Sequence, residues 1–292
     1  MFLHNEYFNT PSDNKTVYHS INIEYFIESI KTKSLRFSSA SSFKDQYEGR
    51  LSYFDYMSIG TFLVDLNIED NIRVGKSRVI LDTYKLQSGD PLPENIFPFQ
   101  YYLDEQSKYI YVHCWSFNKN IQNEDIDENS VLIESTIKRI KESFRNGNYK
   151  FHIGSIEYVN MLTHNGIQNF LYQNSSIYQS ITKNNENRLP YNIIHERHLT
   201  KRLNFKEEQE IRIVISYDDL INKHPEIKRV IPHNPFDEIN EPQLLYKDHI
   251  IFTPINFNRL IKTIYISNSS YKQRLEKLFE QEKIYPEIKY KE

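Results

Sequence analysis

Carboxylates and an arginine alternate along residues 208–212, which read EQEIR. Side chains of a strand alternate between its two faces, so Glu208, Glu210 and Arg212 share one face and the isoleucines form an apolar stripe on the other. Two such carboxylates are about 7 Å apart, and the arginine keeps one ionised and oriented. The pair suits the stabilisation of a cationic, sugar-like transition state or the binding of ribose hydroxyls. The alternative is a solvated strand face with a weak ion pair.

Two polar segments near the N-terminus are further candidates for a ligand site. Tyr18 and His19 end a short apolar run typical of a strand, and an imidazole there can donate to a ligand or be an ordinary packed side chain. The second candidate is the serine-rich turn at residues 38–42 with the side chains that follow it: Phe43, Lys44, Asp45, Gln46, Tyr47, Glu48. Such a turn either lines a polar pocket or bonds to its own backbone.

Other motifs give weaker indications. His195 and His198 could bind a metal from one helix face, but they lack the arrangement of an HExxH site. Cys114, beside Trp115 in an expected strand, indicates a buried thiol. The basic run 197–206 could touch phosphates or form a solvated helix end. The seven glycines form no GxxxxGKS, GxGxxG or GxSxG motif.

The composition of the 292 residues limits the class of protein. The chain has 22 tyrosines, 18 phenylalanines and a single alanine, Ala40, a bias typical of an AT-rich gene such as mobile elements carry. The net charge of −3 gives no global footprint for nucleic acid. One cysteine excludes an internal disulfide and fits a reducing compartment. Without an apolar run of about 18 residues or a signal peptide, we expect a cytoplasmic protein with no membrane contact.

The elements that must position these residues are helices interspersed with short strands. Strands are expected at residues 16–19, 35–37, 108–117, 151–159, 208–216, 263–266 and 287–290, and helices at 23–33, 131–144 and 271–282. The order shows no regular βαβ rhythm, which favours an α+β fold of mixed small sheets with packed helices. We expect a single domain over residues 1–292, with insertions at roughly 50–106 and 160–203.

Several segments together resemble an uncharacterised bacterial domain family, one of the domains of unknown function. They are, in order, Leu35–Glu48, Cys114–Ser116, Ile156–Tyr158, Glu208–Arg212 and Ile261–Ser267. The chain departs from the family pattern at residues 44–46, where Lys-Asp-Gln replaces Asn-Asp-Pro, and it has no recognisable Met-Trp-x-x-Tyr stretch.

The order of an early histidine and a late Glu-x-Glu pair is also similar to that of the ADP-ribosyltransferases, including their DNA- and RNA-modifying toxin branch. That resemblance implies an ADP-ribosyltransferase-like fold in which NAD, the substrate, binds between two small sheets. His19 and backbone groups near it would hold the nicotinamide amide or the adenosine ribose, and Tyr18 would form part of the wall of the nucleotide cleft. Glu210 would stabilise the oxocarbenium ion as nicotinamide leaves, and Glu208 would orient or deprotonate the acceptor.

The same resemblance implies the remaining contacts to NAD. Phe43 or Tyr47 would stack on the nicotinamide, and Arg36 or Arg212 would offset the charge of the diphosphate. The AT-rich composition adds a further expectation, because mobile elements often carry toxins and anti-phage defence genes. We therefore expect a toxin or defence effector that modifies an intracellular acceptor such as RNA, DNA or a protein, with an antitoxin or chaperone as partner.

Two alternatives remain open from the residues alone. The first is a non-catalytic module in which the Glu/Arg face binds a nucleotide or a partner protein. The second is a metal-dependent nuclease that uses Asp45, Glu48, Glu208 and Glu210 around a divalent ion.

Overall fold

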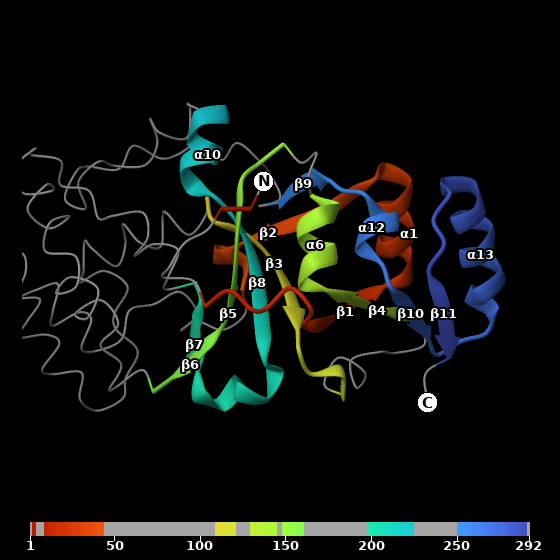
Figure 1. Cartoon of the computed structure of the whole chain (residues 1–292), viewed down its shortest axis with the longest axis horizontal. Coiled ribbons are helices and arrows are strands. Elements are labelled where there is room, and N and C mark those ends of the chain that lie inside the picture. Colours follow the sequence, from red (N-terminus) through yellow and green to blue (C-terminus); the bar gives the residue numbers. More distant parts are fainter. Residues whose placement is uncertain are drawn as a thin grey trace, which may run out of the picture.

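A computed structural model describes residues 2–3, 9–43, 109–120, 129–144, 148–160, 198–224 and 250–290 (Figure 1). Within these ranges, nine strands form one main sheet in the order β11-β10-β4-β1-β3-β2-β9, with β8 on β3 and β5 on β8. Their bounds are β1 Thr16–Asn22, β2 Ser34–Ser39, β3 Tyr111–Ser116, β4 Ser130–Thr136, β5 Phe151–Ser155, β8 Glu210–Ile215, β9 Ile250–Pro254, β10 Thr263–Ile266 and β11 Glu287–Tyr290. The expected mixture of helices and strands is confirmed, but the strands form one large sheet where small sheets were predicted.

The remaining elements are a small sheet and the helices. Strands β6 (Glu157–Val159) and β7 (Thr200–Arg202) pair in parallel as a separate two-stranded sheet. The helices are α1 Ile23–Thr32, α6 Ile137–Ser143, α10 Tyr217–Lys223, α12 Phe257–Leu260 and α13 Ser270–Glu282, with 3-10 turns η1 Ala40–Ser42 and η3 Leu203–Glu208. The predicted insertions at 50–106 and 160–203 lie almost wholly outside the described residues, where the single-domain prediction stays untested.

Helix α1 forms where the sequence predicts it. The side chain of Asn22 caps its first turn by accepting from the Glu24 N–H at 2.9 Å. Lys33 ends the helix in the left-handed conformation, and its N–H returns to the Ile30 carbonyl. The buried apolar residues recur at helical spacing: Ile23, Phe26, Ile27, Ile30.

The predicted helix over residues 131–144 is wrong in its first half. Residues 130–136 form strand β4, which pairs with β1 from Thr16↔Thr136 to Asn22↔Ser130, and helix α6 begins only after it. Thr136 makes the change of element, because its hydroxyl accepts from the Arg139 N–H at 3.2 Å as an N-cap. The apolar run suits a buried strand as well as a helix, and pairing with β1 decides between them.

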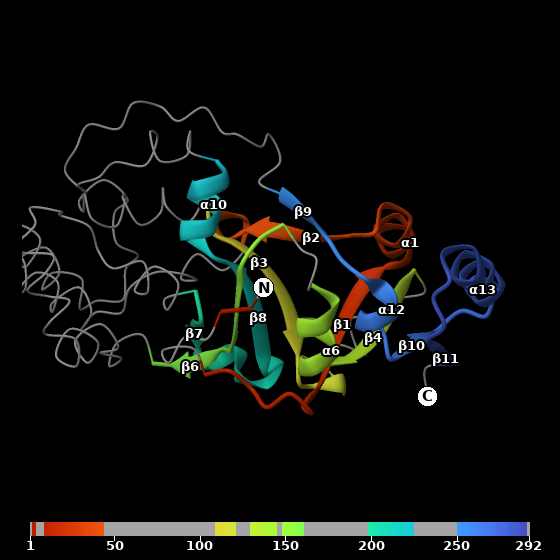
Figure 2. The same cartoon turned by 45° about the horizontal axis from the view of Figure 1, so that its top comes forward.

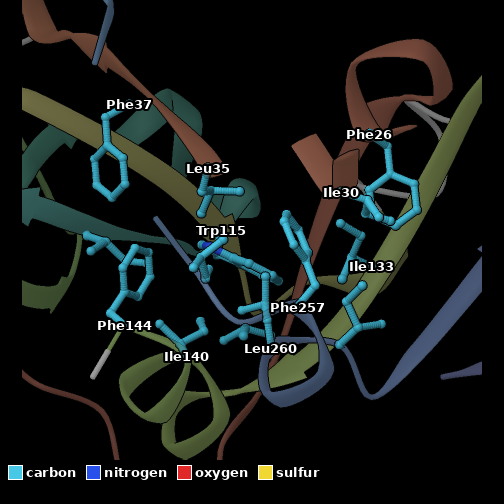
Figure 3. Close-up of a cluster of buried hydrophobic side chains, with 14 of the residues drawn as sticks. Phe26, Ile30, Leu35, Phe37, Trp115, Ile133, Ile140, Phe144, Phe257 and Leu260 are labelled. Atoms are coloured by element: carbon cyan, nitrogen blue, oxygen red, sulfur yellow. The ribbon is translucent and has the colours of Figure 1, made fainter. Parts of the chain in front are cut away.

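Side chains of the main sheet and of the helices that pack on it form one large hydrophobic core. Figure 3 shows residues of β2, β3 and β4 meeting residues of α1, α6 and α12. The labelled residues are Phe26, Ile30, Leu35, Phe37, Trp115, Ile133, Ile140, Phe144, Phe257 and Leu260. The isoleucine stripe of β8 joins this core, as the strand alternation predicts, with Ile211, Ile213 and Ile215 almost fully buried.

The main sheet divides along one edge of β3. On its other edge, β3 pairs with β8 from Val112↔Val214 to Ser116↔Glu210. The dividing edge pairs with β2 at Val112 and Tyr111 and with β1 only at Ser116. Strands β1 and β2 therefore run apart from a common neighbour, as Figure 2 shows, and α1 connects them.

Candidate functional site

A pocket of about 930 Å³ lies where the sheet divides. Its walls come from the end of β1, one face of α1, β2 and the middle of β3, with Phe43 and Phe252 added. Three of the predicted ligand residues line it: His19, Arg36 and Phe43. The geometry thus brings together side chains from two separate segments of the predicted site, residues 18–19 and 35–48.

Two imidazole side chains link the strands where β3 makes few backbone hydrogen bonds to β1 and β2. The ring of His19 on β1 hydrogen-bonds the backbone of Cys114 on β3. The Nδ1 of His113 on β3 lies 3.0 Å from the Arg36 carbonyl on β2, to which it donates. The two rings pack with their centroids 4.6 Å apart and also contact Trp115. His19 therefore links β1 to β3, and His113 links β3 to β2, at the pocket that lies between these strands.

Both of these histidines are held neutral. Burial lowers the pKa of His19 to about 4 and lowers the pKa of His113 well below its ordinary value, and in His113 the neighbouring His19 adds to the effect. With Nδ1 donating to Arg36, the neutral His113 ring keeps an acceptor at Nε2, which has no hydrogen-bond partner among the described residues.

The neutral histidines predict loss of stability in acid. The folded pKa values lie below the unfolded value of about 6.5, so stability is complete above that value and falls as the pH drops toward the folded pKa of about 4. The expected loss is about 1.4 kcal/mol per pH unit for each such histidine. Urea unfolding across this pH range measures the loss. In a His19→Asn variant, the slope of the free energy of unfolding against pH is expected to be smaller by the contribution of one proton. Equal slopes for the two proteins would contradict the assignment.

A buried charge network holds Glu210 next to the pocket wall. Arg212 donates from Nε to Glu210 Oε1 at 2.7 Å and from Nη2 to Oε2 at 3.2 Å. Lys201 Nζ bridges Glu210 Oε2 at 3.2 Å and Glu208 Oε2 at 2.5 Å. Burial raises the pKa of Glu210, and the Lys201 ammonium acts in the opposite direction. Burial also lowers the pKa of Arg212 to about 9.

Glu208 reaches this network differently from the prediction. Strand β8 begins at Glu210, and Glu208 ends the 3-10 turn η3. Gln209 between them has φ 44°, in the left-handed region, which turns the chain out of the strand. The two carboxylates are linked because both pair with the Lys201 ammonium. They are not neighbours on one face of a strand.

Glu210 lies behind the pocket wall and is not among the residues that line it. Cys114 is among the residues that line the pocket, and its thiol donates to the Glu210 carboxylate. Phe43 packs against the charge pair, with its ring centroid 4.7 Å from the Arg212 guanidinium carbon. Glu210 and His19 thus contact one residue, Cys114, the first at its thiol and the second at its backbone.

The other predicted site residues are placed as follows. Arg212 is 1% exposed and also donates to the His198 carbonyl at 2.6 Å, so it is committed to the protein interior. Tyr18, next to His19 on the strand, lies outside the pocket and pairs across the strands with Glu134. Tyr47 lies outside the described residues.

Two observations argue against a metal site among the described residues. Lys201 supplies, between Glu208 and Glu210, the positive charge that a divalent ion would supply in a nuclease. In the described part of the chain, no group of three or more histidine, cysteine, aspartate or glutamate side chains could hold a metal ion. Asp45, Glu48 and His195 lie outside that part.

Sequence reasoning missed several residues of the site. His113 alternates with Tyr111 and Trp115 on the face that joins the core, and a histidine within such an aromatic stripe is the one local signal that could have singled it out. Lys201 was assigned to a phosphate-binding or solvated run, yet it turns inward with 10% of its side chain exposed. Its contact joins β7 to β8, which no local pattern predicts.

Comparison with known proteins gives weak structural similarity only. No family model matches the sequence, so the resemblance to a domain family is not confirmed, and no curated protein matches it. The DarT of Thermus sp. 2.9 in complex with NAD+ is 9% identical, with a TM-score of 0.34 over 97% of this chain and 98% of that chain. The same protein in complex with ADP-ribosylated ssDNA is 11% identical, with a TM-score of 0.32 over 97% of each chain. No helix among the described residues is long and apolar enough to cross a membrane.

Proposed function

We propose that this chain is an NAD-dependent ADP-ribosyltransferase that binds NAD in the pocket where the main sheet divides. The observation that carries the proposal is that His19, Arg36 and Phe43 line one pocket whose wall at Cys114 backs onto the Glu210 carboxylate. The volume of about 930 Å³ lies within the range of small-molecule and cofactor sites.

Arg36 supports the binding of a diphosphate. Its side chain is exposed to the pocket, and within the described part of the chain it has no hydrogen bond or ion pair. An unpaired guanidinium on a pocket wall is suited to bidentate contact with phosphate oxygens. Arg212 cannot share this task, because Glu210 and the His198 carbonyl already occupy it.

The reaction follows from the placement of Glu210. The glycosidic bond between C1′ of the ribose and the nicotinamide nitrogen breaks, and nicotinamide leaves with the bonding electrons. A ribose hydroxyl that reaches Cys114 takes the place of the thiol as donor to Glu210, whose charge stabilises the oxocarbenium ion. The acceptor then bonds to C1′ and loses its proton, for which Glu208, 34% exposed at its side chain, is the proposed base.

The Arg36→Ala variant tests the dinucleotide site. Arg36 is exposed and unpaired in the described structure, so the variant is expected to fold normally and to bind NAD about tenfold more weakly. Calorimetric titration with NAD measures the change. The matched control is Arg274→Ala, which removes an exposed arginine of α13 that pairs with Glu24 of α1 and is not among the residues that line the pocket. NAD affinity that is the same in both variants would place the diphosphate elsewhere.

A non-catalytic nucleotide-binding module is the second candidate. One observation favours it: both oxygens of Glu210 are already paired with Arg212 or Lys201. Measurement of nicotinamide released from NAD by the purified chain separates the two functions, because a module binds NAD and leaves it intact. The nature of the acceptor, the toxin or defence role, the antitoxin or chaperone partner and the cytoplasmic location stay predictions from the sequence.

A further inference from the structure

Two exposed aromatic rings line the pocket from opposite elements. Tyr25 on α1 is 65% exposed and Phe252 on β9 is 61% exposed, and both contribute to the pocket wall. Large aromatic surfaces at a pocket, left open to water, are platforms on which a nucleobase can stack. Phe252 is the cross-strand partner of Arg36 in the β2–β9 pair, so the ring and the guanidinium are neighbours on one face of the sheet.

A carboxylate accompanies the ring on α1. Glu28 follows Tyr25 by three residues, so both side chains lie on one face of the helix, and both line the pocket with Thr32. Within the described part of the chain, the Glu28 carboxylate has no hydrogen-bond or ion-pair partner. An ionised carboxylate only accepts hydrogen bonds, so a ligand at this wall must offer a donor.

We propose that Tyr25, Phe252 and Glu28 form a base subsite that selects a nucleobase with a donor on its edge. The rings stack on the base, and Glu28 accepts a hydrogen bond from its amino group, as the 6-amino group of adenine would donate. This inference rests on the proposed binding of NAD in the same pocket. Arg36 beside Phe252 then lies next to the position of the diphosphate, which follows the adenosine in NAD.

The test is calorimetric titration of the full chain with NAD and with 1,N6-etheno-NAD. The etheno bridge joins N1 and N6 of the adenine, which leaves no N–H donor on that edge but keeps an aromatic surface. The wild-type chain is expected to bind NAD about tenfold more tightly than the etheno derivative, because one hydrogen bond to a charged group is lost. Glu28→Ala is expected to abolish this preference, whereas Tyr25→Ala is expected to weaken both ligands about tenfold.

Matched controls lie on the C-terminal segment, away from the pocket. Tyr285→Ala removes a ring that is 75% exposed, and Glu280→Ala removes an exposed carboxylate of α13, so neither is expected to change either affinity. Equal binding of both dinucleotides by the wild type, unchanged in Glu28→Ala and Tyr25→Ala, would overturn the subsite and leave the proposed function intact. Failure of the wild type to bind either dinucleotide would overturn both.

Discussion

Replacement of Arg212 by methionine is expected to lower the free energy of unfolding by about 3–5 kcal/mol. Arg212 is 1% exposed and donates twice to the 7%-exposed Glu210. Removal of the guanidinium leaves a buried carboxylate with Lys201 as its remaining cation and leaves the His198 carbonyl without this donor. Breaking one side of a buried charge pair costs more than removing both charges, because the survivor stays desolvated. Urea unfolding followed by circular dichroism measures the loss.

The double variant Arg212→Met, Glu210→Gln is the internal control for this prediction. It removes both charges of the pair, so it is expected to be more stable than Arg212→Met alone, although Lys201 and Glu208 remain as an ion pair. A single variant that loses less than about 1 kcal/mol, the value of a surface pair, would show that the network is solvated and not a buried unit.

The Glu210→Gln variant is expected to reduce nicotinamide release from NAD by at least about a hundredfold. Glutamine keeps the shape of the side chain and an oxygen for Arg212, but it removes the negative charge that the proposed oxocarbenium ion requires. NAD affinity is expected to change little, because the glutamine amide oxygen can still accept the hydrogen bond from the ribose hydroxyl. Release rates and calorimetric affinities measured on the same preparations separate these two effects.

Glu207→Gln provides the matched control, because Glu207 is an exposed carboxylate of the same turn. Its rate of nicotinamide release is expected to equal that of the wild type. If Glu210→Gln retains wild-type release while it remains folded, Glu210 does not stabilise the reaction, and the carboxylate network is structural only.

Local sequence patterns predicted those helices and strands whose apolar spacing and capping residues lie within the element itself. Helix α1 follows from its apolar spacing and the Asn22 cap, and the isoleucine stripe of β8 follows from strand alternation. Strand β4 could not be predicted, because its apolar run fits both a strand and a helix. Its pairing with β1, which is more than a hundred residues away in sequence, makes it a strand.

Sequence reasoning selected some of the residues that line the pocket, but it did not predict the geometry that brings them together. His19, Arg36 and Phe43 were expected at a ligand site, and the pocket contains all three. Their convergence depends on the division of the main sheet at β3, which comes from pairings between distant strands. The roles of His113 and Lys201 depend on the same long-range contacts, so no spacing rule could reveal them.

The central claim, that NAD occupies the pocket where the sheet divides, is tested most directly by the fluorescence of Trp115. This is the single tryptophan of the chain, and its ring lies 5.3 Å from His19 and 5.9 Å from His113, which both line the pocket. With selective excitation of tryptophan, titration with NAD is expected to give a saturable change in emission, shifted to at least tenfold higher concentration in Arg36→Glu. The absence of a saturable change up to about 1 mM NAD, or identical titrations for the two proteins, would contradict the claim.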